Sequence, residues 1–279
     1  MQSRFEETAC PFRMTIRHAV GRDTVTKIIR YRLDGEHYGE LQGDEIIPLD
    51  GAFPDFTPTS RPTVRLDEVT VLAPVVPGKT IGVGPNYRAH LRGNPPPPRP
   101  HYWVKPANTL LDPDGVILIP EGPPTTCHES ELAVVIGRTA RDVSAADAAD
   151  HIFGYTCVND VSAGLMHNPP EHLKSQYFVD GKIYDTFGPI GPWIETHLDP
   201  SDLRVRCRVN GETRQDHRTS DFIWTPAELV EFISHVVTLN PGDVIATGSP
   251  PGVAPLKPGD IVEIEVEGIG VLRNTCRKR

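Results

Sequence analysis

Residues 128–137 read HESELAVVIG, two glutamates followed by an uninterrupted apolar run. Successive side chains of a strand point to opposite faces, so Glu129 and Glu131 are expected to share one face. The apolar run after them predicts a buried strand. Carboxylates at the mouth of a buried strand are costly unless they are paired or bind a metal. The segment therefore predicts a strand of the core sheet that begins at a charged site.

A third carboxylate follows a second apolar segment. Asp160 lies in VNDVSA (158–163), directly after GYTCV (154–158). Three carboxylates with water completing the shell suit Mg²⁺, Mn²⁺ or Ca²⁺ far better than zinc. A pair of glutamates two residues apart is also typical of the exposed rim of a sheet, and the spacing alone leaves that alternative open.

The rest of the chain is dominated by predicted strands. Short segments rich in Val and Ile are separated by turn pairs such as Asp-Gly at 114–115 and Asn-Gly at 210–211, which favours a β-rich fold. The predicted strands cover residues 81–84, 115–120, 131–137, 204–211, 243–248 and 260–274.

Two helices are predicted among these strands. Residues 144–153 begin with a Ser cap and carry Asp in the first turn. Residues 225–237 have a Thr cap, Pro at the first helical position and Glu three residues after the cap. The fold class is therefore α+β and predominantly β.

The chain divides at a soft boundary near residue 70. Residues 14–48 alternate in short apolar stretches and predict a small antiparallel sheet, so we assign residues 1–70 to a small β-rich N-terminal domain. Residues 71–279 then form the main domain. The segment GNPPPPRP (93–100) predicts a stiff surface loop or, alternatively, a lid over the site.

Composition excludes several classes of protein. The 279 residues carry a formal charge of −9, which argues against broad binding to nucleic acid or anionic membranes. The five cysteines form no C-x-x-C pair, so neither a disulfide framework nor a thiolate zinc site is expected. No 18-residue apolar run and no signal-peptide pattern is present. The expected location is the cytoplasm or, alternatively, an organelle whose targeting signal the sequence does not reveal.

From about Val71 onward the chain resembles the fumarylacetoacetate hydrolase superfamily. Eight segments match in the order of the family and cover roughly three-quarters of the chain: IGVGPNYRAH, HYWVKPANTLL, HESELAVVIG, YTCVNDVSA, DGKIYDTFGPIGPWI, the VNGE hairpin, LNPGDVIATGSPPGV and PGDIVEIEVEGIG. The resemblance implies a roll of mixed β-sheet around the site, and a homodimer. It also assigns Glu129, Glu131 and Asp160 to the metal, with Mg²⁺ or Mn²⁺ as the expected ion and Ca²⁺ as an alternative.

The resemblance further implies a set of catalytic and substrate-binding residues. Lys182 in DGKIYDTFGP corresponds to a lysine beside the metal, where an ammonium group can bind a carboxylate or enolate oxygen. His90 in NYRAH corresponds to a base or water activator. Tyr87 and Thr247 are assigned with Lys182 to substrate binding. Lys105, in the WVKP segment, is interpreted as structural.

Two positions depart from the family pattern. Members that hydrolyse or decarboxylate acylpyruvates carry a glutamate three residues after this histidine, and here that residue is Gly93. Many members also carry an arginine after NDVSA, and here that residue is Gly164. Candidates for the second vacancy are His167, His172, Arg88 and Arg92. Both changes lie on the substrate side, which suggests an altered substrate or reaction.

The leading hypothesis is metal-dependent hydrolysis of a C–C bond in an acylpyruvate- or fumarylacetoacetate-like β-diketo acid, with a small oxo acid as substrate. The alternative from the same family is a decarboxylase or isomerase of a 2-oxo or 2-hydroxy-dienoate diacid, which depends less on an activated water. A third hypothesis is a non-catalytic protein that retains the metal pocket.

Overall fold

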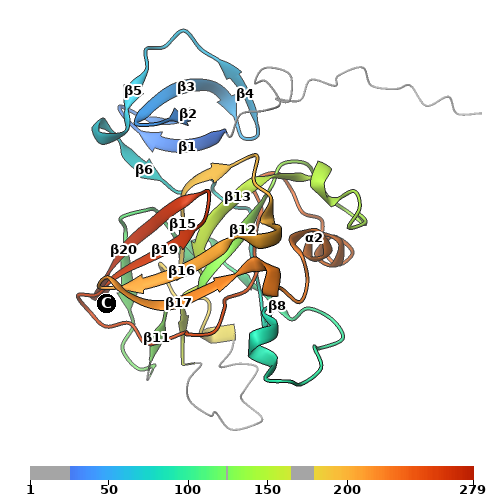
Figure 1. Ribbon diagram of the computed structural model, residues 1–279. Helices are drawn as coiled ribbons and strands as arrows, with labels where there is room; N and C mark the ends of the chain where they lie inside the picture. The colour runs from blue at the N-terminus through green and yellow to red at the C-terminus, as the bar shows by residue number, and fades with distance from the viewer. Residues whose placement is uncertain (1–25, 124, 165–178) are drawn as a thin grey trace, which may run out of the picture.

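A computed structural model describes residues 26–123, 125–164 and 179–279 (Figure 1). The first part of the sheet predicted over residues 14–48, up to residue 25, lies outside the described residues, as do His167 and His172. The fold is predominantly β, with a curled sheet and few helices, which confirms the predicted fold class. Among the described residues, no helix is both long enough and apolar enough to cross a membrane.

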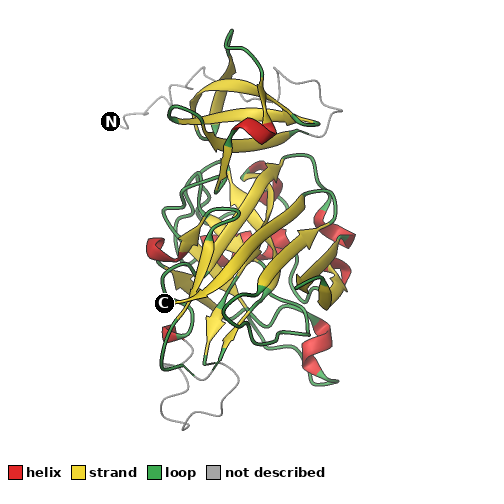
Figure 2. Cartoon of the chain, turned by 90° about the vertical axis from the view of Figure 1, so that its left-hand side faces the viewer, coloured by secondary structure: helices red, strands yellow, loops and turns green. Residues whose placement is uncertain are grey.

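The N-terminal strands gather at one end of the molecule (Figures 1 and 2). β1 pairs with β2 and β6, and the small core of this region consists of Ile29, Tyr31, Leu41 and Ile46. The strands are β1 (Lys27–Arg32), β2 (Glu36–Gln42), β3 (Glu45–Ala52), β4 (Asp55–Pro58), β5 (Val64–Arg65) and β6 (Thr70–Leu72). The assignment of residues 1–70 as a separate domain stays a prediction.

The main body is built from two sheets. Ten strands of a 13-stranded sheet run in the order β4-β3-β2-β1-β15-β13-β12-β18-β7-β8, and its other three strands pair outside this order: β5 with β3, β6 with β1 and β9 with β15. A five-stranded sheet runs β10-β20-β19-β16-β17. The strands of the first sheet beyond the N-terminal region are β7 (Thr80–Val83), β8 (Tyr102–Lys105), β9 (Leu110–Leu111), β12 (Ser130–Ile136), β13 (Ile152–Asn159), β15 (Gly188–Glu195) and β18 (Val244–Ala246). The second sheet contains β10 (Val116–Ile119), β16 (Arg204–Val209), β17 (Glu212–Arg218), β19 (Ile261–Val266) and β20 (Gly270–Lys278), while β11 (Thr126–Cys127) pairs with β14 (Ser162–Ala163).

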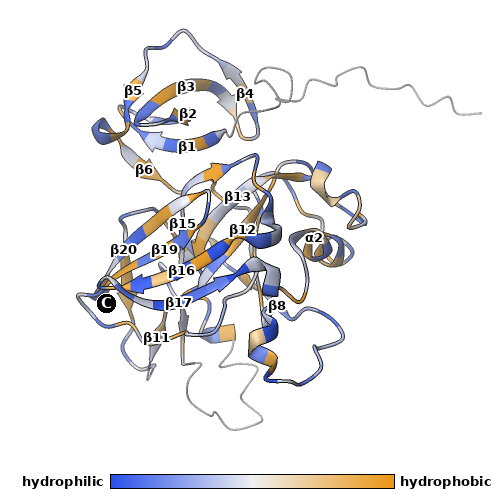
Figure 3. Ribbon diagram, in the orientation of Figure 1, coloured by the Kyte–Doolittle hydropathy of each residue, from blue (hydrophilic) through white to orange (hydrophobic). Residues whose placement is uncertain are grey.

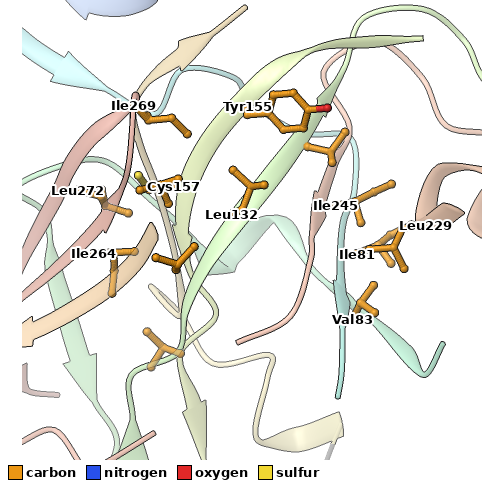
Figure 4. Packing of buried hydrophobic residues seen from close by; sticks show 14 of the residues in the cluster. Ile81, Val83, Leu132, Tyr155, Cys157, Leu229, Ile245, Ile264, Ile269 and Leu272 are labelled. Atoms are coloured by element: carbon orange, nitrogen blue, oxygen red, sulfur yellow. The ribbon is translucent and has the colours of Figure 1, made fainter. Parts of the chain in front are cut away.

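Strand β12 is buried on both faces, each of which contributes to a hydrophobic cluster. Leu132, on one face, belongs to the large core that includes Cys157 of β13 and Ile264 of β19 (Figure 4). Ala133 and Val135, on the other face, belong to a second cluster. The alternation places Ser130 on the face of Leu132, and Glu129 and Glu131 on the face of Ala133. The apolar run was therefore correctly interpreted as a buried strand.

Of the two predicted helices, the second is confirmed. Helix α2 spans Pro226–Ser234, and the side chains of Thr225 and Glu228 form the predicted capping box. Leu229, Val230 and Ile233 of this helix are fully buried. Short 3₁₀ turns also form: η2 (Leu66–Glu68), η3 (Arg88–Leu91), η4 (Ala107–Thr109), η5 (Ala148–Asp150), η7 (Pro200–Asp202) and η8 (Thr219–Asp221).

The predicted helix over residues 144–153 is wrong. Only the short turn η5 forms there, and β13 begins at Ile152. The Ser144 hydroxyl donates to Asp147 Oδ2 at 2.6 Å, and the Asp147 N–H donates back to Ser144 Oγ, which closes a local turn. The Gly137 N–H donates to the His151 carbonyl at 2.8 Å. The antiparallel pairing of β12 with β13 thus takes up the end of the segment in which the local pattern favours a helix.

Candidate metal centre and active site

The pairing of β12 with β13 brings the three predicted carboxylates together. Ser130 at the start of β12 pairs with Asn159 at the end of β13, so Glu129 and Asp160 lie side by side. The Asp160 N–H donates to the Glu129 carbonyl at 3.0 Å. Candidate ligand oxygens of Glu129, Glu131 and Asp160 all lie within 4.8 Å of one another, and all three residues are buried. Two segments 31 residues apart therefore form a single acidic cluster.

Two buried lysines partly balance this negative charge. Lys182 Nζ lies 2.8 Å from Asp160 Oδ2 and 2.9 Å from Glu129 Oε1, and it also donates to the Asp160 carbonyl. Lys105 Nζ lies 2.5 Å from Asp160 Oδ1. Lys182 also lies over the ring of Trp103, 4.7 Å from its centroid. Three carboxylates face two ammonium groups, so the cluster carries one net negative charge when all five groups are ionised.

The charges shift the ionisation of these groups in different directions. Burial disfavours the charged form of Asp160 and would raise its pKa. The positive charges of Lys105 and Lys182 outweigh this effect, so the pKa of Asp160 is lowered. Burial likewise opposes the charged form of Lys182, while Asp160 and both glutamates raise its pKa. Burial raises the pKa of Glu131 well above its ordinary value, and the charges of Asp160 and Glu129 add to the shift. Glu131 is therefore the carboxylate that most needs a further cation.

Glu131 supplies the observation that tests the fit to a metal. Its Oε2 accepts a hydrogen bond from the Gly248 N–H at 2.7 Å. Its Oε1 is buried and has no hydrogen-bond partner among the described residues. A buried, unpartnered carboxylate oxygen beside two other carboxylates is a donor set for a hard divalent cation. The described residues therefore fit a divalent metal, and Glu129, 8% exposed, lies where the cluster meets solvent.

The loop of residues 247–252 is hydrogen-bonded to β12 and to Glu131 of this cluster. Thr247 donates to the Leu132 carbonyl through both its N–H and its hydroxyl, at 3.0 and 2.8 Å. Its own carbonyl accepts from the Asn86 side chain at 2.7 Å. With these bonds the loop is fixed to β12 beside Glu131. The Thr247 hydroxyl is thereby occupied by the backbone, and its assignment to substrate binding stays a prediction.

Gly248 allows the loop to approach this closely. Its φ is +105°, and a Cβ at this position would lie 2.7 Å from Asn86 Cβ and 3.1 Å from the Val83 carbonyl. We expect Gly248→Ala to displace the N–H from Glu131 and to lower Mn²⁺ affinity roughly 10- to 100-fold, the range for loss of a group that orients a ligand. Isothermal titration calorimetry measures this.

Gly259→Ala is the matched control. Gly259 also has a positive φ, +94°, but a Cβ there would meet nothing within 4 Å. This substitution carries the backbone strain without the clash, so Mn²⁺ affinity should not change. Equal Mn²⁺ affinities for the two variants would show that the Gly248 N–H does not orient Glu131.

His90 lies on the 3₁₀ turn η3 and is anchored to the same loop. Its Nε2 lies 2.9 Å from the carbonyl oxygen of Ser249, the residue after Gly248. A carbonyl only accepts, so Nε2 carries the proton, and Nδ1 of the neutral ring is the free basic nitrogen. Among the described residues, no carboxylate is hydrogen-bonded to this ring. The role of His90 as a base stays a prediction, now with a defined tautomer.

The two departures from the family pattern are both glycines in left-handed backbone. Gly93 has φ +85° and Gly164 has φ +75°. A Cβ at either position would meet no described atom within 4 Å. Arg88 and Arg92, which flank His90, are exposed. Arg88 and Gly93 line a surface hollow of about 310 Å³, and His90 is not among the residues that line it.

Tyr87 is wholly buried against Phe222, and its hydroxyl has no partner among the described residues. Burial raises its pKa, with the charge of Glu131 as a second cause. A neutral phenol near the cluster can donate a hydrogen bond. Its assignment to substrate binding stays a prediction, as does that of Lys182, whose three N–H groups are taken up by Asp160 and Glu129.

Sequence reasoning missed several groups that hold the site together. Lys105 was interpreted as structural, and its ion pair with Asp160 was not predicted. The Ser162 hydroxyl donates to Glu129 Oε1 at 2.6 Å, and Asn86 and Gln215 secure the 247–252 loop. The burial of Lys105 could have been predicted. In YWVK (102–105), strand alternation places Lys105 on the same face as Trp103, a large apolar residue. No local pattern marks Gln215.

Comparisons with known proteins agree with this architecture. Residues 79–277 match the family described as fumarylacetoacetate (FAA) hydrolase, C-terminal, and residues 26–74 match the Rv2993c-like N-terminal family. The mitochondrial oxaloacetate tautomerase FAHD2A of Bos taurus is 40% identical over 230 residues, which cover 77% of this chain and 72% of that protein.

Two solved structures show the same fold. The crystal structure of 2-hydroxyhepta-2,4-diene-1,7-dioate isomerase from Mycobacterium marinum has a TM-score of 0.82 and 38% identity, covering 91% of this chain and 99% of that one. The crystal structure of maleylpyruvate hydrolase from Sphingobium sp. SYK-6, in complex with manganese(II) and pyruvate, has a TM-score of 0.73 and 30% identity, covering 90% of this chain and 99% of that one. The resemblance drawn from the sequence is confirmed: this chain belongs to the fumarylacetoacetate hydrolase superfamily.

Proposed function

We propose that the protein is a divalent-metal-dependent isomerase that shifts a proton within a 2-oxo or 2-hydroxy-dienoate dicarboxylate. The observation that carries the proposal is the environment of His90. Its ring is held by the Ser249 carbonyl, and Gly93 replaces the acid that the family's hydrolases use. A carboxylate partner stabilises the imidazolium that forms when histidine deprotonates water, and a carbonyl does so less. A histidine without a carboxylate partner is suited to moving a proton within the substrate, which requires no activated water.

The metal is proposed to be held by Glu129, Glu131 and Asp160. The net negative charge of the cluster and the unpartnered Glu131 Oε1 support Mg²⁺ or Mn²⁺, with Ca²⁺ as an alternative. The related maleylpyruvate hydrolase structure contains manganese(II) and pyruvate, a 2-oxo acid. When bound, the metal would polarise the 2-oxo group and so make the neighbouring C–H bond more acidic.

Within this site, His90 Nδ1 accepts the proton from the carbon next to the 2-oxo group. That C–H bond breaks, a C=C bond forms, and the proton is delivered to the enolate oxygen, where an O–H bond forms. A double-bond isomerisation differs only in returning the proton to a carbon further along the chain. No water is consumed and no C–C bond breaks. Lys182 and Lys105 hold the carboxylates in place through their ion pairs.

The named relatives support a dicarboxylate as substrate. Oxaloacetate and 2-hydroxyhepta-2,4-diene-1,7-dioate, the compounds in the names of the tautomerase and the isomerase, each carry two carboxylates. The exposed Arg88 beside His90 is a candidate for the distal carboxylate, and Tyr87 and Thr247 are proposed to line the substrate. We also propose that the protein is a cytoplasmic homodimer. Size-exclusion chromatography with light scattering would measure the mass of the assembly and so test the dimer.

Hydrolysis of a C–C bond is the second candidate. The observation that favours it is the 30% identity to maleylpyruvate hydrolase over 90% of this chain. The metal carboxylates would serve both reactions, so the proposals differ in whether water is activated. Release of pyruvate together with a second acid from an acylpyruvate would identify the hydrolase.

We expect His90→Ala to lower kcat for enol-to-keto conversion of oxaloacetate roughly 10²- to 10⁴-fold, the usual contribution of a general base. The rate is measured from the loss of enol absorbance with Mn²⁺ present, and the same assay with EDTA is the metal-free control. Mn²⁺ affinity should not change, because His90 is not among the three carboxylates.

His151→Ala is the matched control, since this histidine is also hydrogen-bonded to a backbone carbonyl, that of Thr139, at 2.9 Å. It lies at the opposite end of β12 and β13, where Gly137 pairs with it. Its kcat should equal that of the unsubstituted protein. Full activity of His90→Ala would exclude His90 as the base.

A further inference from the structure

Strand β17 is hydrophilic along its length (Figure 3), and Gln215 is its one buried residue. It is 1% exposed, and the other residues of β17 are exposed or half-buried. The register between β16 and β17 shifts here: Cys207 pairs with Gln215, and Arg208 pairs with Thr213. A bulge of this kind redirects a side chain. The strand thus turns Gln215 inward, toward the start of β12.

The side-chain amide of Gln215 is fully used. Its Oε1 accepts from the Ser130 N–H and hydroxyl, both at 3.1 Å, and from His128 Nδ1 at 3.0 Å. Its Nε2 donates to Ser249 Oγ at 2.7 Å and to the Pro250 carbonyl at 2.6 Å. A backbone N–H only donates and a carbonyl only accepts, so the amide orientation is unambiguous.

These partners stand next to the functional groups on both sides. His128 and Ser130 flank Glu129, and Ser130 also precedes Glu131. On the other side, Ser249 follows Gly248, the donor to Glu131, and its carbonyl holds the His90 ring. Gln215 is therefore the bridge between the strand that carries the glutamates and the loop that carries the anchor of His90.

The loop lies directly on the bulge. Gly252 has φ +105°, and a Cβ there would lie 2.2 Å from the Arg214 carbonyl and 3.1 Å from Gln215 Cγ. Only glycine permits this approach. This contact fixes the loop against β17 next to Gln215. The side-chain amide of Gln215 then bridges β17, in one sheet, and β12, in the other.

We propose that Gln215 is a positioning residue that sets the placement of His90 relative to the metal-binding glutamates. Its acceptor side fixes the start of β12, and its donor side fixes residues 249 and 250. The part of this inference that concerns metal affinity rests on the proposed function, whereas the part that concerns the His90 ring does not.

Two substitutions separate the two sides of the amide. Gln215→Leu removes both, and we expect Mn²⁺ affinity to fall roughly 10- to 100-fold, as for other groups that orient metal ligands. Gln215→Glu keeps the acceptor toward Ser130 and His128 but loses the donor toward Pro250. In this variant Mn²⁺ affinity should stay close to that of the unsubstituted protein, while the His90 anchor is released.

The ring of His90 is followed by ¹⁵N NMR of histidine side chains in metal-free protein, with its signals identified from their loss in His90→Ala. The unsubstituted protein should show the tautomer protonated at Nε2. Both Gln215 variants should show a mixture of tautomers, because the Ser249 carbonyl no longer holds the ring. Calorimetric titration with Mn²⁺ is the second readout.

Asn274→Leu is the matched control for simple loss of a buried amide. Asn274 is also 1% exposed and donates to two backbone carbonyls, those of Asp112 and Gly115. It should lower the melting temperature without changing the His90 signals or Mn²⁺ affinity. Unchanged His90 signals in Gln215→Glu, which keeps the contacts of β12, would overturn the proposal. Absence of Mn²⁺ binding in the unsubstituted protein would refute the metal site alone, and the NMR result would still decide the role of Gln215.

Discussion

Glu131→Gln is expected to reduce Mn²⁺ affinity by more than the roughly 100-fold that loss of a supporting hydrogen bond costs. The amide oxygen can still accept from the Gly248 N–H, but an NH₂ group then takes the place of Oε1, the oxygen without a partner. The metal loses a charged ligand while the shape of the site is retained. Calorimetric titration with Mn²⁺ measures the effect.

The same substitution should not destabilise the metal-free protein. Burial raises the pKa of Glu131 in the folded state, so the folded protein binds more protons than the unfolded chain above the ordinary glutamate pKa of about 4.3. The free energy of unfolding therefore falls as pH rises, and glutamine abolishes that contribution. Urea denaturation in EDTA at pH 6 and pH 8 should show that the advantage of the variant over the parent grows with pH.

Glu195→Gln is the control for burial of a carboxylate. Glu195 is fully buried, accepts one backbone N–H from His197, and has no partner on Oε2 among the described residues. It lies away from the other carboxylates, in β15 opposite Lys27. Its replacement should leave Mn²⁺ affinity unchanged. If Glu195→Gln and Glu131→Gln lowered affinity equally, the assignment of Glu131 as a ligand would be wrong.

Asp160→Ala is expected to lower the free energy of unfolding in EDTA by about 3–5 kcal/mol, the cost of leaving a buried charge without its partner. Asp160 is the acceptor for Lys105 and Lys182, and all three side chains are essentially inaccessible to solvent. Lys105 is the more affected lysine, because burial already lowers its pKa and Asp160 is the main group that offsets this. Urea denaturation measures the loss.

The pH dependence of this loss follows from Lys105. Without Asp160 its folded-state pKa falls further below that of the unfolded chain, so the unfolded state binds more protons and stability rises with pH. The deficit of Asp160→Ala should therefore shrink between pH 7 and pH 9. Asp216→Ala breaks the surface pair with Arg204, whose side chains are 34% and 45% exposed, and should cost about 0–1 kcal/mol. A deficit of that size for Asp160→Ala would contradict the charge balance described for the buried cluster.

Much of the site follows from strand alternation and from order along the chain. Alternation alone places Glu129 and Glu131 on one face, and the apolar run of β12 predicts its burial. The approach of Asp160 depends on the antiparallel pairing of β12 with β13, which was not predicted. The family resemblance assigned Asp160 to the metal without this pairing. The capping box of α2 was readable because all of its groups lie within four residues.

What the sequence did not predict depends on long-range packing. Gln215 faces the site only because a bulge in β17 redirects it, and a bulge has no reliable signature in a single sequence. Lys105 lies 55 residues before Asp160 and meets it through the pairing of β8 with β7. The helix expected over residues 144–153 failed for the same reason, since the β12–β13 pairing overrides local preference there.

The most direct test of the proposed reaction is a time course of ¹H NMR spectra in D₂O, with the protein, Mg²⁺ and either oxaloacetate or an acylpyruvate. The account predicts Mg²⁺-dependent exchange of the C3 protons for deuterium, abolished by EDTA and strongly slowed in His90→Ala, with no cleavage products above the enzyme-free rate. Mg²⁺-dependent release of pyruvate and a second acid from the acylpyruvate, or of carbon dioxide from oxaloacetate, without faster C3 exchange, would contradict it and assign the site to C–C bond cleavage.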